Sequence, residues 1–508
     1  MNQATRQVAF RVDASAQTGT GHVMRCLSLA DSLKGVGVRS RFVSRHMPEH
    51  LCRLLHAGGH RVDALVEAAE PVGHDLPHAA WLETSQRADA REAARVLSTA
   101  RCDWIVVDHY ALDSRWESAL RPAASRLMAI DDLADRVHDC DLLLDQSSPA
   151  DAAERYHGKV PASCRLVLGA RYALLREEFR AARRSARPRD GRVQRVLVFL
   201  GGVDAGGHTL TAIEALRRLD ARGLHVDVVI GPQHASRKAI EDKCKALGFQ
   251  CHAGSERMAG LMSSADLAIG AGGSSTWERC CLGLPTLTLC AAENQRPLVE
   301  ACARNGLIYA PQLDLRDPAS FELHLRALLA NPMLLQSMSR NGLHAVDGRG
   351  TLRVMRDMGY ATITVRAAQP SDSGRLHEWR NHPEVRAASH NSDPIDRAAH
   401  EKWFASTLAD ADRHLLVGED GAQPVGVVRF DVRGAEVEVS IYLAPDRAGE
   451  GNGTELLQAA ESWLAANRPQ ATRLVAQVLG GNLRSHGLFE ACGYRKSETQ
   501  YAKELVRT

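Results

Sequence analysis

The chain has 508 residues, which at about 150 residues per domain predicts three domains or slightly more. Hydrophobic residues make up 44% of it and charged residues 24%, which is typical of a globular chain and excludes low-complexity disorder, collagen and a coiled coil. The net charge is +2 and only 5% of the residues are aromatic, so neither charge nor base-stacking side chains favour a nucleic-acid partner.

No segment predicts a membrane span or export. No window reaches the ~18 uninterrupted apolar residues that a membrane helix requires. The first twelve residues lack a basic segment followed by an apolar one, so we expect a cytoplasmic protein without a membrane partner. The twelve cysteines form no C-x-x-C pair, and we expect reduced, buried thiols.

Short apolar runs alternate with helical patterns over roughly the first 330 residues, which predicts layers of parallel strands and helices. We expect a first Rossmann-like domain at residues 1–185, with helices such as 22–34 and 88–99. Its predicted strands are 8–12, 38–43, 103–108, 127–131 and 141–145. Residues 176–195 contain eight arginines, and we interpret this run as a solvated connector; a phosphate-binding role is the alternative.

A second Rossmann-like domain is expected at residues 186–358, with strands at 196–200, 226–230, 268–270 and 286–290. Ligands would bind between the two domains, at the carboxyl ends of the strands. The segment 19–24 lacks the third glycine of a dinucleotide fingerprint and no Walker sequence is present, which disfavours NAD binding and ATP hydrolysis. Residues 359–508 change to an α+β pattern, with β-rich runs at 415–417, 425–428 and 437–443 and a glycine-rich turn, 449–453, before a helix at 454–466.

The loop after the first strand carries a candidate catalytic residue. Gly19 and Gly21 allow close approach of a ligand, and the helix that follows directs its N–H groups at the same cleft. His22 opens this helix, whose positive end disfavours the imidazolium, so we expect a ring that accepts a proton. Asp13 is the nearest acid that can orient it. A capping histidine without chemistry is the alternative.

The second domain supplies a matching loop, A-G-G-S-S-T-W-E at 271–278, between a strand and a helix. Its glycine N–H groups and its three hydroxyls suit a diphosphate. Glu278 can accept hydrogen bonds from ribose hydroxyls, and Gly201-Gly202 allows another close approach. No cluster of metal ligands is evident, and we predict no metal.

Several motifs together resemble a known family: V-D-A-S at 12–15, G-x-G-H-V-M-R-C at 19–26, V-V-D-H-Y at 106–110, G-G-S-S-T-W-E at 272–278 and A-E-N-Q at 292–295. In this order, over residues 6–350, they are similar to the UDP-sugar hydrolases of pseudaminic acid biosynthesis. The resemblance implies two Rossmann-like domains of glycosyltransferase-B type and cleavage of UDP-2,4-diacetamido-2,4,6-trideoxy-β-L-altropyranose to UDP and free sugar.

The same resemblance implies that His22 activates water for attack at the anomeric carbon with inversion. Tyr110 and Asn294 would line the sugar site, and Ser275 and Glu278 would hold UDP. The predicted substrate site comprises Asp13, Gly21, Arg25, Tyr110, Gly201, Gly273, Ser274, Ser275, Glu278, Asn294 and Gln295.

Residues 362–505 resemble the GNAT acetyltransferases, through Y-L-A-P at 442–445, R-A-G-E-G-N-G at 447–453, N-L-R-S-H-G-L-F at 482–489 and C-G-Y at 492–494. The resemblance implies acetyl-CoA as co-substrate, with its pyrophosphate on glycine N–H groups at a helix start. The predicted acetyl-CoA contacts are Leu443, Gly449, Gly451, Gly453, Thr454 and Asn482.

Two positions depart from the GNAT pattern. Ala448 replaces the usual arginine or glutamine, with Arg447 displaced by one residue. Phe489 replaces the tyrosine that serves many members as an acid, and Tyr442, Ser485 and His486 are possible substitutes that spacing does not rank.

Together the two resemblances imply a bifunctional enzyme whose partners are UDP-linked amino sugars and neighbouring enzymes of the same sugar pathway. The acetyltransferase would acetylate the C4 amine of the preceding intermediate, UDP-4-amino-4,6-dideoxy-N-acetyl-β-L-altrosamine. One alternative is a glycosyltransferase that uses a sugar or lipid hydroxyl instead of water. Another is a C-terminal CoA-fold module that binds without catalysis.

Overall fold

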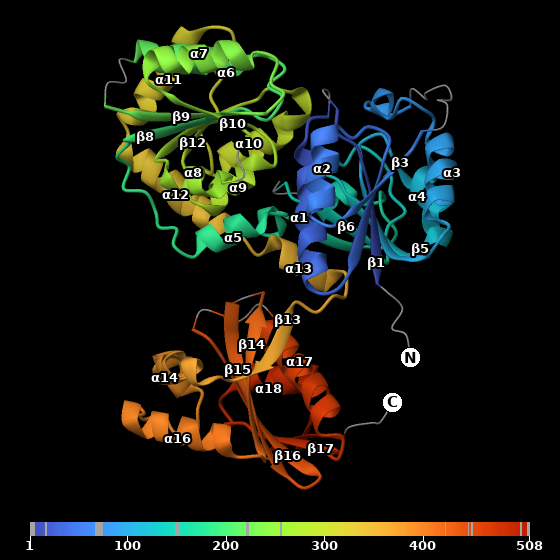
Figure 1. Ribbon diagram of the computed structural model, residues 1–508, viewed down its shortest axis with the longest axis vertical. Coiled ribbons are helices and arrows are strands. Elements are labelled where there is room, and N and C mark those ends of the chain that lie inside the picture. The colour runs from blue at the N-terminus through green and yellow to red at the C-terminus, as the bar shows by residue number, and fades with distance from the viewer. Residues whose placement is uncertain are drawn as a thin grey trace. The chain divides into compact units, whose positions relative to one another are not determined.

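A computed structural model of the protein describes residues 6–15, 18–66, 75–147, 153–219, 223–254, 257–421, 423–445, 447–448, 451–497 and 500–504 (Figure 1). The chain divides into two compact units, Met1–Met358 and Gly359–Thr508. Within the described residues, no helix has the length and apolar character needed to cross a membrane.

The first unit starts with a seven-stranded sheet in the order β3-β2-β1-β4-β5-β6-β7, in which all neighbours are parallel. Its central strands are mostly buried because helices cover both faces of the sheet (Figure 1). The strands are β1 (Gln7–Val12), β2 (Arg39–Ser44), β3 (Arg61–Ala64), β4 (Cys102–Asp108), β5 (Ala124–Ile130), β6 (Leu142–Asp145) and β7 (Arg165–Leu168). The helices are α1 (Gly21–Gly35), α2 (Glu49–Ala57), α3 (Gln86–Leu97) and α4 (Ser114–Leu120), with the short 3₁₀ turns η1 (Ala79–Leu82), η2 (Arg121–Ala123), η3 (Glu154–Tyr156) and η4 (Ala170–Tyr172).

The order of this sheet reverses between β1 and β4. Phe10 of β1 pairs with Phe42 on one side and with Val106 of β4 on the other, and at the carboxyl edge Val12 pairs with Asp108. Parallel sheets bind ligands in the crevice at such a reversal, outside the carboxyl ends of the strands. Because β1 and β4 are neighbours there, the loop that leads into α1 and the loop after β4 begin side by side.

A second, five-stranded parallel sheet follows, in the order β10-β9-β8-β11-β12. Its strands are β8 (Arg195–Phe199), β9 (His225–Ile230), β10 (Gln250–Ala253), β11 (Leu267–Ala271) and β12 (Thr286–Leu289). The helices are α5 (Glu177–Arg183), α6 (His208–Arg218), α7 (Arg237–Leu247), α8 (Met258–Ser264), α9 (Ser275–Cys281), α10 (Arg296–Arg304), α11 (Pro318–Leu329), α12 (Pro332–Ala345) and α13 (Gly350–Asp357), with the turn η5 (Glu293–Gln295). The mixed α/β architecture with parallel sheets that the sequence predicts is confirmed.

The last helix of the unit, α13, packs against α1 and η4, which belong to the part of the unit that contains the first sheet. Thr351 Oγ1 accepts a hydrogen bond from the Leu175 backbone, and Arg353 donates to the Arg171 carbonyl at 2.8 Å. Trp104 of β4 donates its indole N–H to the carbonyl of Met358 at 3.1 Å. The chain thus crosses between the two sheets twice, near residue 175 and again near residue 350.

The arginine-rich segment 176–195 is more than a solvated connector. Arg189 donates to the backbone carbonyls of Met262 and Ala265 at 3.0 and 3.1 Å, and also to that of Leu282. These carbonyls lie at the carboxyl ends of α8 and α9, where a cation is favourable because the last carbonyls lack helical partners. Arg189 therefore fastens the connector to the second sheet's helices.

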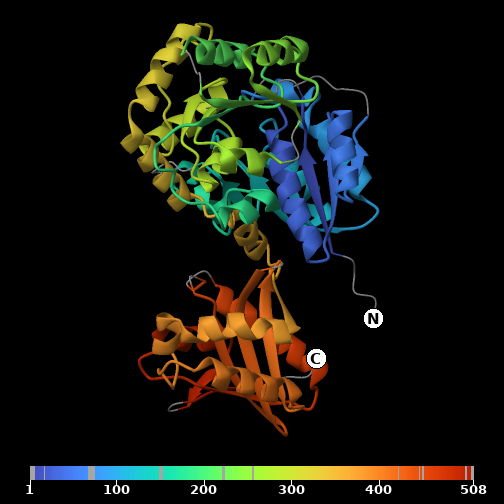
Figure 2. The ribbon, with the colours of Figure 1, turned by 60° about the vertical axis from the view of Figure 1, so that its left-hand side comes forward.

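The second unit contains a mixed seven-stranded sheet in the order β13-β14-β15-β16-β17-β19-β18. Figures 1 and 2 show α14 and α16 on one face of this sheet and α17 on the other. The strands are β13 (Ile363–Ala367), β14 (Arg413–Asp420), β15 (Gln423–Arg433), β16 (Glu436–Leu443), β17 (Arg473–Gln477), β18 (Arg495–Ser497) and β19 (Gln500–Glu504). The helices are α14 (Ser373–Asn381), α15 (Pro383–Ala387), α16 (Arg397–Ala409), α17 (Asn452–Asn467) and α18 (Leu483–Ala491), with the turn η6 (Pro370–Asp372).

The strands β16 and β17 are parallel neighbours that separate before they end. Their pairing covers Glu436–Glu438 of β16, although that strand continues to Leu443. A gap between two such strands leaves backbone N–H and C=O groups available to a ligand with amide groups of its own.

Candidate active site

The first candidate site lies at the reversal of the first sheet, where α1 begins beside the end of β4. Nδ1 of His22 is 2.6 Å from Oδ1 of Asp108. One helical turn after His22, Arg25 donates from Nε and Nη2 to the two oxygens of the same carboxylate, each at 2.6 Å. The His22 side chain is 13% exposed and the Asp108 side chain is fully buried, so the carboxylate lies behind the ring.

These contacts favour one tautomer of the neutral His22 ring. Burial alone would raise the pKa of Asp108, but Arg25 and His22 outweigh burial and hold this pKa well below its usual range. Because the carboxylate is ionised and can only accept, Nδ1 must carry the proton of this bond. In the neutral ring, Nε2 is then the nitrogen with a lone pair.

The prediction that Asp13 orients His22 is wrong, because Asp108 takes this position. Asp13 is only 2% exposed, and its Oδ1 accepts hydrogen bonds from Ser44 Oγ and the Arg45 backbone, both at 2.8 Å. Arg11 Nη1 lies 2.8 Å from the same oxygen. Asp13 therefore ties the end of β1 to the end of β2 and holds the loop that leads to His22.

Aromatic rings surround His22 on the side of the loop after β4. Tyr110 stands edge-on to the His22 ring, with centroids 4.9 Å apart, and its hydroxyl donates to Asp132 at 2.5 Å. Asp132 also receives Arg25 Nη1 at 3.1 Å. Tyr110, predicted to contact sugar, is buried and its hydroxyl is held within this network.

Two further rings were not found from the sequence. His78 and Trp81, at η1, lie with centroids 5.4 and 5.7 Å from the Tyr110 ring and 4.4 Å from each other. Both are half-buried. No spacing rule connects them to His22, because η1 precedes α3 and reaches the site only through the tertiary fold.

The second glycine loop lies directly opposite the start of α1. A Cβ atom on Gly21 would come within 3.2 Å of Ser274 Oγ, and one on Gly202 within 3.8 Å of Thr20 Oγ1. This close approach leaves a side chain at position 21 little room. The predicted loops around Gly21, Gly201 and Gly273 are thus brought together.

Donors of the second loop differ in their availability. None of the described residues accepts a hydrogen bond from the backbone N–H of Ser274 or Ser275. The Ser275 hydroxyl receives a hydrogen bond from the buried Arg279 at 2.9 Å, so its orientation is set by that guanidinium. The two N–H groups can bind an anion in front of the loop.

Glu278 and the amide pair Asn294-Gln295 flank this loop. Burial raises the pKa of Glu278, which Arg176 opposes from 3.2 Å. Gln295 lies in η5, and a Cβ on Gly273 would be 3.9 Å from its Nε2. Asn294, its neighbour, is half-buried.

In the second unit, the predicted acetyl-CoA contacts gather where β16 ends and α17 begins. Gly451 is the N-cap of α17 with φ of +77°, which only glycine adopts readily, and Gly453 and Thr454 follow in the first turn. Leu443 ends β16 beside the gap toward β17. Asn482 caps α18, accepting from the Ser485 backbone at 3.1 Å. Gly449 lies outside the described residues.

The position of the missing tyrosine is part of the core. Phe489 is 3% exposed, with its ring 5.0 Å from that of Tyr494 and 5.9 Å from that of Tyr501. Of the possible substitutes, Tyr442 lies on β16, while His486 Nδ1 pairs with the Tyr501 hydroxyl at 2.6 Å.

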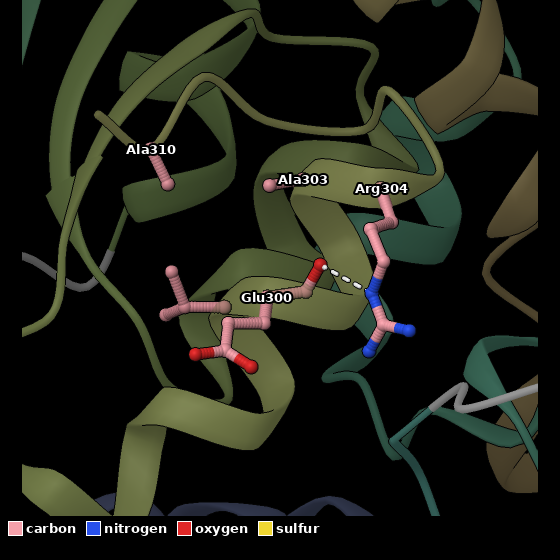
Figure 3. A pocket seen from close by; sticks show the side chains of 5 residues that line it. Glu300, Ala303, Arg304 and Ala310 are labelled. Carbon is pink, nitrogen blue, oxygen red and sulfur yellow. Dashed lines mark hydrogen bonds between the residues drawn. The ribbon is translucent and has the colours of Figure 1, made fainter. Parts of the chain in front are cut away.

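A separate hollow of about 350 Å³ lies along α10 (Figure 3). Val299, Glu300, Ala303, Arg304 and Ala310 line it. Arg304 Nε donates to the Glu300 carbonyl at 3.4 Å, as the dashed line shows. No residue of the predicted sites lines this hollow.

Comparison with known proteins separates the two units. Residues 362–495 match the model of the acetyltransferase (GNAT) domain family, so this part of the chain is a GNAT domain. An uncharacterized protein of Methanocaldococcus jannaschii is 20% identical over 98% of this chain and 99% of its own length. The UDP-2,4-diacetamido-2,4,6-trideoxy-β-L-altropyranose hydrolase of Campylobacter jejuni is 22% identical over 59% of this chain and 97% of its own. The spore coat polysaccharide biosynthesis protein SpsG of Bacillus subtilis is 30% identical over 38% of this chain and 58% of its own.

Proposed function

We propose that the chain is a bifunctional nucleotide-sugar enzyme of pseudaminic acid biosynthesis, with domains at 1–185, 186–358 and 359–508. The first two, as a glycosyltransferase-B-type pair, hydrolyse UDP-2,4-diacetamido-2,4,6-trideoxy-β-L-altropyranose to UDP and the free sugar. The third acetylates the C4 amine of the UDP-linked precursor. The similarity to the Campylobacter jejuni hydrolase and the GNAT domain support the two halves of this proposal.

One observation carries the hydrolase half: His22 binds Asp108 through Nδ1 at the point where the two glycine loops meet. With Nδ1 committed, Nε2 accepts a proton from water as its oxygen attacks the anomeric carbon. The bond from that carbon to the UDP oxygen breaks, and Asp108 stabilises the imidazolium that forms. Such general-base help is typically worth about 10²–10⁴ in rate.

The leaving group takes up negative charge as the bond breaks. The N–H groups of Ser274 and Ser275 and the Ser274 hydroxyl would face the diphosphate and stabilise this charge. Glu278 would accept hydrogen bonds from the ribose. UDP is a good leaving group already, so orientation of water supplies much of the remaining barrier reduction.

The residues at the end of β16 fit acetyl-CoA, which supplies an acetyl thioester. The first turn of α17, with Gly451 and Gly453, would bind the pyrophosphate, and the open edge of β16 near Leu443 would pair with the amides of the pantetheine arm. The acceptor amine must lose a proton before or during attack on the thioester carbonyl. Little other chemistry is needed, so orientation of the amine by the sheet face supplies most of the reduction of the barrier.

The two halves are tested in one experiment with the full chain. The UDP-4-amino sugar is supplied with and without acetyl-CoA, and products are identified by mass. We expect UDP release only when acetyl-CoA is present, because the diacetamido sugar must form first. Release of UDP only after addition of a sugar or lipid alcohol would instead favour the glycosyltransferase alternative. The absence of any acetylated sugar would favour a binding module.

A further inference from the structure

Three arginines converge on one face of the GNAT sheet, away from the α17 face. Arg429 lies on β15, while Arg380 and Arg386 come from α14 and α15. Arg429 and Tyr442 share this face, because Arg429 pairs with Ser440 and Val427 with Tyr442 across β15 and β16. Burial lowers the pKa of Arg380. The charge of Arg386 lowers this pKa further and Tyr442 partly raises it, which is consistent with both side chains lying near Arg380.

The guanidinium groups are only partly satisfied. Arg380 donates one N–H to the Asn391 carbonyl at 2.8 Å, and Arg386 one to the Ser392 carbonyl at 3.3 Å. Arg380 Nη1, Arg386 Nε and Arg429 Nε are buried, and no described residue accepts a hydrogen bond from any of them. Buried guanidinium N–H groups without acceptors are costly, so they point to an acceptor supplied by a ligand.

The charge of the group is positive. Asp431 pairs with Arg429 at 2.9 Å, but none of the described acidic residues forms an ion pair with Arg380 or Arg386. A planar guanidinium with free N–H groups matches the oxygens of phosphate and carboxylate. The same field repels a polyamine.

The arginines also adjoin the predicted acetyl-CoA site. Tyr442 immediately precedes Leu443, and the Asn482 side chain donates to the Ala388 carbonyl at 3.4 Å, two residues after Arg386. An anion held by the arginines would therefore place an amine attached to it close to the end of β16.

We propose that Arg380, Arg386 and Arg429 bind an anionic group of the amine acceptor, so that this unit acetylates amines that carry a diphosphate or a carboxylate. The choice of the diphosphate rests on the proposed function, since a UDP-linked amino sugar carries one. An α-amino acid would supply the carboxylate instead.

The test uses the full chain with His22→Asn, so that nucleotide sugar is not consumed by the first unit. Four acceptors are compared: the UDP-4-amino sugar, the free 4-amino sugar, L-methionine sulfone and spermidine. We expect kcat/KM for an anionic acceptor to exceed that for the free amino sugar and spermidine by about tenfold to a hundredfold, the usual worth of a charge-assisted hydrogen bond.

Arg380→Gln and Arg386→Gln should each raise KM for the anionic acceptor by about tenfold or more, with KM for acetyl-CoA and the melting temperature little changed. Arg380→Lys should restore part of the affinity. Arg375→Gln, an exposed position on the same helix, is the matched control and should change nothing. A merely structural role would raise KM for charged and uncharged acceptors alike, and that result would overturn the proposal, as would efficient acetylation of spermidine.

The outcomes separate the two proposals. Arginine-dependent acetylation of L-methionine sulfone but not of the UDP-4-amino sugar would keep the anion site and reject the proposed substrate. If no amine is acetylated, the anion site is tested instead by measuring the binding of inorganic pyrophosphate by calorimetry. Equal binding by the His22→Asn chain with and without Arg380→Gln would then overturn the anion site, and weaker binding with Arg380→Gln would support it.

Discussion

Nδ1 of His22 lies 2.6 Å from Oδ1 of a fully buried Asp108, and Arg25 binds both oxygens of the same carboxylate. The histidine is thus oriented from behind, with Nδ1 bound to the Asp108 carboxylate. Asp132 continues this network from Arg25 to the Tyr110 hydroxyl, whose ring packs against His22.

Asp108→Asn tests whether this carboxylate positions the base. An asparagine amide can donate to Nδ1, which moves the ring proton to Nε2 and removes the lone pair that water needs. We expect kcat to fall by about 10² or more, with UDP affinity nearly unchanged. The variant also leaves Arg25 with fewer acceptors, so its melting temperature is measured alongside. Unchanged kcat in a folded variant would contradict the positioning role.

Glu278→Ala tests where UDP binds. Loss of hydrogen bonds from the ribose to a carboxylate should weaken UDP binding by about 1.5–3 kcal/mol. The loss should raise KM more than it lowers kcat, because ribose contacts are alike in the ground and transition states. Arg176→Ala is the control, since it removes the partner of Glu278 but not the acceptor itself. An unchanged KM for Glu278→Ala would mean that UDP binds elsewhere.

The stability of the first unit should depend on pH through His138. Burial opposes a charged ring, but Asp131, 3.7 Å from Nε2, and Glu117, 2.8 Å from Nδ1, outweigh it and raise the pKa of His138 to about 9, from 6.5. The stabilisation is therefore complete below about pH 6.5 and is lost as pH rises through about 9, at most about 3 kcal/mol in all. Hydrogen exchange of β5 peptides, corrected for intrinsic rates, measures it. The same pH dependence in His138→Gln would refute this origin.

Phe489→Tyr tests whether the acetyltransferase lacks an acid. The ring is buried among Tyr494 and Tyr501, and an added hydroxyl that stays without a hydrogen-bond partner there should cost about 1–3 kcal/mol of stability. We expect the acetylation rate to change less than tenfold, because on the proposed function the wild-type chain acetylates without an acid at this position. If the wild type is inactive and Phe489→Tyr restores transfer, the unit is a decayed enzyme that only binds.

Apolar runs in the sequence predicted most of the strands of the two parallel sheets, because buried parallel strands are near-continuous apolar runs. The strand expected at 103–108 is observed at Cys102–Asp108, and the helix expected at 22–34 is observed at Gly21–Gly35. The short strands β3, β7 and β10 were missed, since four residues with mixed polarity give no clear pattern.

The partner of His22 could not be predicted from nearness in the sequence. Asp13 is nine residues from His22 and Asp108 is 86, yet the sheet order places β4 next to β1 and brings Asp108 to the ring. The motif V-V-D-H-Y did contain this residue, at the end of an apolar run. The cluster of Arg380, Arg386 and Arg429 could not be predicted from the sequence either, because α14, α15 and β15 come together only in the folded unit.

The central claim is that His22 activates water to hydrolyse a UDP-sugar, and UDP release measures this directly. The full chain is given UDP-2,4-diacetamido-2,4,6-trideoxy-β-L-altropyranose with no alcohol acceptor, beside the His22→Asn variant. We predict stoichiometric UDP and free sugar from the wild type, and a kcat lower by at least about 10² in the variant with its affinity for UDP retained. Near-wild-type turnover by His22→Asn, or no UDP from the wild type until an alcohol is added, would contradict the claim.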